Sequence, residues 1–327
     1  MLAVKGGCSS MDVLGIDISK DDFHTCLIQG AKRRSKTFVN TPTGYRQVQA
    51  WLKNRRCTEV HACMESTGAY WTGLATALYN AGMKVSVVNP SQTSFFSRSQ
   101  LRRTKTDEVD AEMIADYCVQ RQPGAWVPPP PQILELRALL NYRDHLVRER
   151  VRLRQVASQT HMSADVRRLH LRHIKTLNSS IAALKKQLET LVKADPKIDA
   201  AVRELCKTKG FGPLSAASIV ARLPVDRLRN AKAAVAQAGL SPGERSSGTS
   251  VRGKRKICKV GDADLRGTFY MPALAAIRSN NVLRPFVQRL KARGKEDMVI
   301  VVAVMRKLLV HAYTVLRNLQ RAQAAAA

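Results

Sequence analysis

Acidic side chains are scarce in this sequence. Asp and Glu together number 25 against 54 Lys and Arg, which gives a formal net charge of +29 over 327 residues. Folding gives a soluble domain no reason to carry so much self-repulsion. The usual reason is a polyanionic partner, because each phosphate that a cation neutralises releases condensed counterions. The charge therefore indicates nucleic acid; an anionic membrane surface is the competing explanation, but the chain lacks a hydrophobic anchor and a basic amphipathic terminus.

The sequence also lacks paired cysteine motifs and membrane signals. Its seven cysteines are scattered without a CxxC spacing, which argues against a disulfide framework and a zinc site and fits a reducing cytosol. No run approaches the roughly 18 apolar residues of a membrane span, and the first ten residues lack the apolar core of a signal peptide. Met11, just before the first strand-like run, is an alternative start to Met1. We expect a cytoplasmic, nucleoid-associated protein with no membrane partner.

What the sequence does contain is enough apolar material, 45% of all residues, for the cores of two domains. Over the first 122 residues, apolar periodicity predicts three strands, a helix, a strand, a helix, a strand and a helix. This order matches a ribonuclease-H-like α/β domain, in which the first three strands form a meander and later strands alternate with helices. The predicted strands lie at 12–16, 24–30, 36–40, 60–65 and 84–90.

A proline-rich segment marks the clearest domain boundary. Residues 123–131 include four consecutive prolines, which make a stiff linker. Residues 132–193 are charged, with apolar residues at helical spacing, and predict two helices of coiled-coil character that favour dimerisation or spacing over nucleic-acid contact. We therefore expect a catalytic α/β domain over 11–122, the linker and long helices over 123–195, and a mainly helical C-terminal domain over 196–322.

Four acidic residues fall where the predicted fold would bring them together. Asp17 ends the first strand, Glu65 ends the fourth, and Asp107 and Asp110 share one face at the start of a helix. Such a cluster cannot remain ionised without cations, and its oxygen ligands imply Mg²⁺ or Mn²⁺. Two such ions ~3.5–4 Å apart can hold the attacking and leaving oxygens of a phosphoryl transfer. The structural alternative for each acid alone is a favourable place at a strand end or beside the helix dipole.

Two features of the C-terminal region suit a phosphate partner. The turn Gly210-Phe211-Gly212 resembles a helix–hairpin–helix motif, whose backbone amides approach a phosphate; a plain connection between helices is equally compatible. Residues 241–262 are expected to form an exposed loop whose hydroxyls suit attack on a phosphodiester and whose cations stabilise the developing charge. From composition alone, a loop that merely contacts phosphate is favoured. Its hydroxyl residues are Ser246, Ser247, Thr249 and Ser250, and its cations are Arg245, Arg252, Lys254, Arg255 and Lys256.

Several ordered motifs resemble one known family. GIDISK, CMESTGAY, VSVVNP, LRRTKTDEVDAEMIADYC, the GFG turn, AGLSP, SSGTSVRG and YMPA occur in the order seen in DEDD transposases of the one-ten group of insertion sequences and in Piv-type DNA invertases. The resemblance extends from about Met11 to the last helix. It implies a RuvC-like N-terminal domain with Asp17, Glu65, Asp107 and Asp110 as metal ligands. It also implies a nucleophilic serine at Ser247, although Ser246 occupies a position where relatives tend to carry an acid or another residue.

The same resemblance implies particular partners. In such family members a structured non-coding RNA pairs with target and donor DNA. The recombinase acts as a tetramer whose active sites each combine carboxylate and serine domains from different subunits, and strand exchange passes through a Holliday junction. We therefore expect double-stranded DNA, a structured guide RNA and a homo-oligomer, dimer to tetramer. The residues expected to contact nucleic acid are Arg102, Arg103, Lys105, Gly210, Gly212, Arg252, Lys254, Arg255 and Lys256.

The sequence leaves three functions to compare. A transposase or site-specific recombinase needs the four acids, Mg²⁺ and the Ser247 hydroxyl, with Arg252 and Lys254 assisting electrostatically. A metal-dependent nuclease or Holliday-junction resolvase that uses water needs the acids but not the serine. A non-catalytic nucleic-acid-binding protein needs neither.

Overall fold

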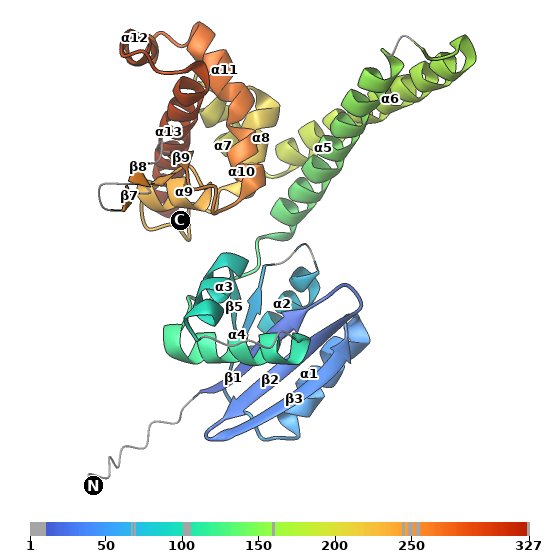
Figure 1. Cartoon of the computed structure of the whole chain (residues 1–327), viewed down its shortest axis with the longest axis vertical. Coiled ribbons are helices and arrows are strands. Elements are labelled where there is room, and N and C mark those ends of the chain that lie inside the picture. The colour runs from blue at the N-terminus through green and yellow to red at the C-terminus, as the bar shows by residue number, and fades with distance from the viewer. Residues whose placement is uncertain are drawn as a thin grey trace. The chain divides into compact units, whose positions relative to one another are not determined.

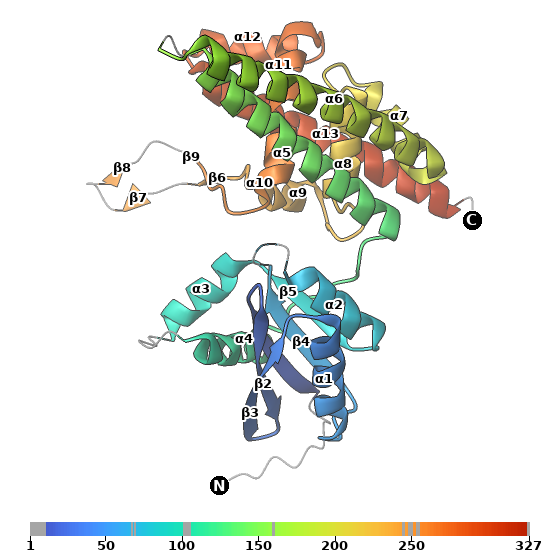
Figure 2. The same ribbon diagram turned by 90° about the vertical axis from the view of Figure 1, so that its right-hand side faces the viewer.

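The computed structural model describes residues 11–66, 68, 70–100, 106–158, 161–243, 246–247, 251–252 and 256–325. The chain divides into two compact units, Met1–Pro128 and Pro129–Ala327, which are described separately (Figures 1 and 2). The three-part division expected from the sequence stays a prediction.

A five-stranded mixed sheet forms the centre of the first unit (Figure 1). Its order is β3-β2-β1-β4-β5; β2 is antiparallel to β1 and β3, whereas β4 is parallel to β1 and β5. This is the meander followed by parallel strands that the sequence predicted, so the ribonuclease-H-like strand order is confirmed. The strands are β1 (Asp12–Ile18), β2 (Asp22–Gln29), β3 (Lys32–Val39), β4 (Val60–Glu65) and β5 (Lys84–Val88).

Helices cover both faces of this sheet (Figure 2). On one face, α1 (Pro42–Lys53) and α2 (Trp71–Asn80) bury Leu52, Leu74 and Leu78 against the strands. On the other face, α3 (Pro90–Ser99) and α4 (Asp107–Arg121) bury residues such as Phe96 and Ile114. α3 was not predicted from the sequence, in which Pro90 was interpreted only as the end of a strand. A proline in the first helical turn also starts helices, and here Asn89 caps the helix by accepting a hydrogen bond from the Ser91 backbone N–H at 2.8 Å.

The second unit is helical, as predicted. It begins with α5 (Pro131–Ala157) and α6 (Ala164–Ala194), which lie side by side (Figures 1 and 2) and bury Leu146, Leu177 and Leu184 between them. Their coiled-coil character stays a prediction. The helices that follow are α7 (Pro196–Cys206), α8 (Pro213–Arg222), α9 (Ala231–Gln237), α10 (Ala263–Thr268), α11 (Tyr270–Ser279), α12 (Arg284–Ala292) and α13 (Asp297–Ala325).

The last helix, α13, is the apolar centre of this unit. An 18-residue window within it has a mean hydropathy of 1.8, so the helix is long and apolar enough to cross a membrane. The expectation that no segment comes near this limit was therefore wrong. Half of that window is buried within the unit, where Leu308, Leu309 and Ala312 are almost fully covered. Packing against the surrounding helices accounts for the apolar composition.

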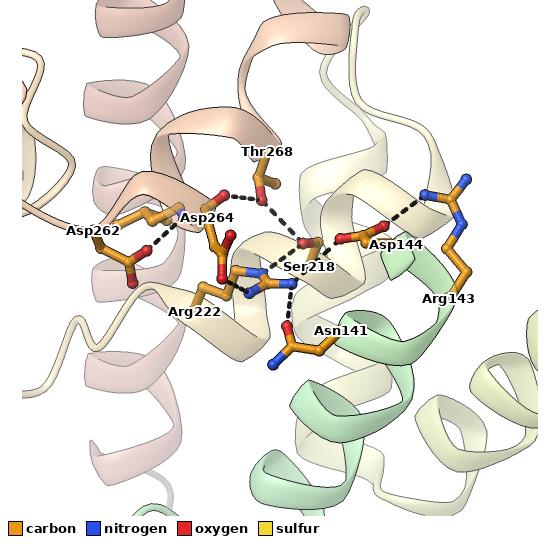
Figure 3. A network of polar contacts seen from close by, with 9 residues as sticks. Asn141, Arg143, Asp144, Ser218, Arg222, Asp262, Asp264 and Thr268 are labelled. Atoms are coloured by element: carbon orange, nitrogen blue, oxygen red, sulfur yellow. Dashed lines mark hydrogen bonds and ion pairs between the residues drawn. The ribbon is translucent and has the colours of Figure 1, made fainter. Parts of the chain in front are cut away.

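A buried arginine joins three helices of the second unit (Figure 3). Arg222 of α8, whose side chain is 7% exposed, donates to the side-chain carbonyl of Asn141 in α5 at 2.8 Å. It also donates to the Ser218 hydroxyl at 3.2 Å and lies 3.4 Å from the Asp264 carboxylate of α10. Since a buried cation needs such partners to offset its lost hydration, these bonds fix α8 against α5 and α10.

Candidate active site

The ends of two neighbouring strands carry the first two candidate acids. β1 and β4 run parallel, with Ile16 opposite Met64. The next residues along the two strands are Asp17 and Glu65, so both carboxylates lie at the same edge of the sheet. Sequence reasoning predicted this placement from the strand ends.

A glycine lets the helix that carries the other two acids approach β1. A Cβ atom on Gly15 would lie 2.3 Å from both the Ala111 carbonyl oxygen and the Ala115 nitrogen of α4. No larger side chain fits without a shift, since a glycine within a strand permits close backbone approach. Because α4 lies this close to β1, its first turn, with Asp107 and Asp110, reaches the end of the strand.

The electrostatics of Asp17 indicate that the other three acids lie near it. The pKa of Asp17 is raised from 3.8 to about 6, first by burial and then by the negative charges of Asp110, Glu65 and Asp107, against a smaller lowering by His24. Burial and neighbouring like charges both disfavour the ionised form. Within the part of the chain that the structure describes, no three Asp, Glu, His or Cys side chains are placed to hold one metal ion.

The chemistry of this donor set nevertheless fits a divalent cation. Carboxylate oxygens are the ligands that Mg²⁺ and Mn²⁺ take in proteins. Burial and then the negative charges of the three other carboxylates raise the pKa of Asp17, and a cation bound among these carboxylates would offset the repulsion that Asp17 feels.

Two residues beside the acids were not found from the sequence. His24 of β2 is the register partner of Asp17, and its Nε2 lies 3.7 Å from the Asp107 carboxylate while its Nδ1 lies 3.0 Å from the Thr37 hydroxyl. Thr93 of α3 is buried and donates a hydrogen bond to the Glu65 carboxylate. Local sequence patterns predicted neither the strand register, which places His24, nor α3, which carries Thr93.

The candidate nucleophile lies in the second unit, in a segment more regular than the exposed loop that was expected. β7 (Ser246–Ser247) pairs antiparallel with β8 (Val251–Arg252), which places Ser247 opposite Val251. Next to them in the chain, β6 (Pro242–Gly243) pairs with β9 (Lys256–Ile257). Backbone pairing over such short ladders needs no apolar alternation, so the Gly- and Ser-rich composition concealed it.

Several expected nucleic-acid contacts cannot be placed or are placed by their backbone alone. Ser247, Arg252 and Lys256 lie in the short ladders. Five of the expected contacts lie outside the described part of the chain: Arg102, Arg103, Lys105, Lys254 and Arg255.

The glycine turn between α7 and α8 has a packing requirement. Gly210 adopts a φ of 119°, and a Cβ there would lie 2.9 Å from the Ala276 Cβ of α11. Glycine is therefore needed so that the turn can pack against α11. Gly212, the N-cap of α8, has open space around it. Phosphate binding by this turn stays a prediction.

Comparison with known proteins covers both units. Residues 14–163 match a family of DEDD transposases of the IS110 type, described as transposase, and residues 202–288 match the transposase IS116/IS110/IS902 family. Pilin gene-inverting proteins of Moraxella lacunata and Moraxella bovis are each 30% identical over 317 residues, which cover 94% of this chain and 97% of theirs.

Among solved structures, the T. thermophilus RuvC in complex with a Holliday junction substrate matches with 16% identity and a TM-score of 0.27, covering 35% of this chain and 98% of that one. The strand order, the two family matches and the nearly full-length relatives lead to one assignment. The chain belongs to the IS116/IS110/IS902 family of transposases, enzymes that recombine DNA.

Proposed function

We propose that this protein is a metal-dependent DNA recombinase that cleaves and rejoins strands through a phosphoserine at Ser247. The observation that carries the proposal is the convergence of three other carboxylates on Asp17 in a chain of this family. The Ser247 hydroxyl attacks the scissile phosphorus. A serine–phosphorus bond forms, the bond from phosphorus to one deoxyribose oxygen breaks, and that oxygen leaves as a hydroxyl with the proton that serine gave up. The broken strand stays attached for rejoining.

The carboxylates hold the metal in this proposal. Asp17, Glu65, Asp107 and Asp110 would bind Mg²⁺ or Mn²⁺, which supplies positive charge at the reacting phosphate when bound. The protein's own residues orient these ligands: Thr93 fixes Glu65 by a hydrogen bond, and His24 lies beside Asp107. Arg252 and Lys254, which follow the serine in the chain, would stabilise the charge that develops on the phosphate.

The partners in this proposal are double-stranded DNA and a structured guide RNA encoded by the mobile element. The net charge of +29 supports polyanionic partners, and the likeness to insertion-sequence transposases supports the RNA. The acids lie in one compact unit and the serine in the other, which is compatible with active sites that combine the two from different subunits of a tetramer. The protein would act in the cytoplasm, at the nucleoid.

The decisive experiment traps the covalent intermediate. Purified protein is incubated with the element's end and target DNA, flanking RNA transcribed from the element, and Mg²⁺, and is then denatured to detect DNA-linked protein. Ser247→Ala is expected to lose the adduct while retaining DNA binding. Ser246→Ala is the matched control and is expected to keep it.

Each other outcome of this trapping experiment has a definite meaning. An adduct lost only in Ser246→Ala would move the nucleophile by one residue. Cleaved DNA with free ends and no adduct in the wild type would favour the nuclease or resolvase that uses water. Activity unchanged in Asp17→Asn would remove the carboxylates from the chemistry.

A further inference from the structure

A basic groove opens in the second unit, and none of its lining residues lies in β6, β7, β8 or β9. It encloses a volume of about 670 Å³. Three distant segments form it: the end of α7 with the turn after it, the α11–α12 connection with α12, and the middle of α13. Its lining residues are Lys207, Thr208, Lys209, Asn280, Asn281, Val282, Leu283, Phe286, Arg289, Lys307, Leu308 and His311.

The charge of the groove has one sign. Lys207, Lys209, Arg289 and Lys307 line it, and no Asp or Glu does. Lys207 is paired with Glu204 at 2.5 Å. Among the described residues, no ion pair joins a carboxylate to any of the other three cations, whose side chains are exposed. Three positive charges without an acidic ion-pair partner among the described residues therefore line the groove.

Contacts within the unit hold these cations in place. The Lys307 Nζ lies 5.2 Å and the Arg289 guanidinium 5.7 Å from the centroid of the Phe286 ring, within the range of a cation–π attraction. The Asn280 side-chain amide donates to the Lys209 carbonyl at 2.9 Å and so ties the lysine turn to the end of α11. The groove is therefore assembled by tertiary packing, and its cations are held close together.

We propose that this groove binds the phosphodiester backbone of a nucleic acid. Clustered cations without a neutralising acid gain from phosphate neutralisation and counterion release, and side-chain amides such as that of Asn281 add the neutral donors common at backbone contacts. None of the residues that were expected to bind nucleic acid lines the groove, although one of them, Gly210, directly follows Lys209 in the chain. The inference rests on the proposed function, in which the protein binds DNA and RNA. DNA and RNA share this chemistry.

The test compares single charge reversals of equal size in the full-length protein. A fluorescein-labelled 20-base-pair DNA duplex and an RNA duplex of matching sequence are titrated without Mg²⁺ over a series of salt concentrations. Lys307→Glu and Arg289→Glu are expected to weaken binding about tenfold and to reduce the slope of log Kd against log salt by about one. Arg321→Glu is the matched control: this exposed residue is also on α13, does not line the groove, and is expected to change Kd by less than about twofold.

The outcomes separate the groove from the proposed function. A selective loss on either duplex supports the groove and identifies whether DNA or RNA occupies it. Equal losses in Lys307→Glu and Arg321→Glu on both duplexes would overturn the groove alone. A wild-type protein that binds neither duplex would overturn the groove and the proposed function together. Thermal unfolding of each variant controls for folding, and Lys209→Glu, in a turn, repeats the test away from the helices.

Discussion

Asp17 carries an electrostatic penalty that its neighbours impose. Its side chain is partly buried at the end of β1, and burial first, followed by the negative charges of three other carboxylates, raises its pKa to about 6. A proton on Asp17 is therefore held more tightly in the folded protein than in the unfolded chain. Asp17 thus favours the folded state most below pH ~4, and this contribution is lost as pH rises through about 6.

From this linkage we predict that Asp17→Asn stabilises the metal-free protein at pH 7. The substitution removes the charge that the fold disfavours, so the midpoint of thermal unfolding in a chelating buffer should rise. The gain should shrink as the pH approaches 4. Mg²⁺ should stabilise the wild type at pH 7 and the variant much less, because a ligand that binds only the folded state raises its stability.

The matched control for Asp17→Asn is Asp21→Asn, which removes one exposed carboxylate close by. It should leave the unfolding midpoint and the response to Mg²⁺ unchanged. If Asp17→Asn were less stable than the wild type at pH 7 without metal, the repulsion described for this site would be wrong.

At the scale of elements, short helices of the second unit depend on polar bonds as well as on apolar packing. α10 follows the hairpin that carries Ser247, and Asp262 caps it by accepting a hydrogen bond from the Leu265 backbone N–H at 2.9 Å. Arg222 then links α10 to α8 and α5 (Figure 3). Arg222 therefore helps to fix α10, the helix that follows the hairpin in the chain.

We predict that Arg222→Ala destabilises the second unit. The substitution removes a buried guanidinium and leaves Asn141 and Ser218 without that partner. Asp264 is 64% exposed, so solvent screens part of the ionic contribution, and we expect a loss of about 2–4 kcal/mol in the free energy of unfolding. Urea denaturation measures it. Arg203→Ala breaks an ion pair with Asp199 in which the Arg203 side chain is 76% exposed, and it should cost less than about 1 kcal/mol. Equal losses in both variants would contradict a special role for Arg222.

At the scale of the whole molecule, the acids and the serine belong to different compact units. If each active site takes its acids from one subunit and its serine from another, two inactive variants should complement each other. We predict that Asp17→Asn mixed with Ser247→Ala recovers recombination that neither shows alone, measured by the formation of recombined DNA. Asp17→Asn mixed with Asp110→Asn should remain inactive, because neither variant supplies a complete set of the four acids. Failure of the first mixture would place each complete site within one subunit.

The sequence by itself determined most of the helices and strands of the first unit and the positions of two candidate acids. Short β-rich runs predicted the strand order, and acids at the ends of two of those strands predicted where Asp17 and Glu65 lie. The helical periodicity after the prolines predicted α5 and α6. These features are local, because side-chain periodicity and turn-forming residues act over a few positions of the chain.

Only the tertiary structure decided which side chains meet. Strand register set His24 opposite Asp17, α3 brought Thr93 to Glu65, and the missing side chain of Gly15 let α4 approach β1. The basic groove joins cations that are separated by up to a hundred positions in the chain. Such contacts depend on strand register and on the packing of distant segments, which no local pattern in the sequence encodes.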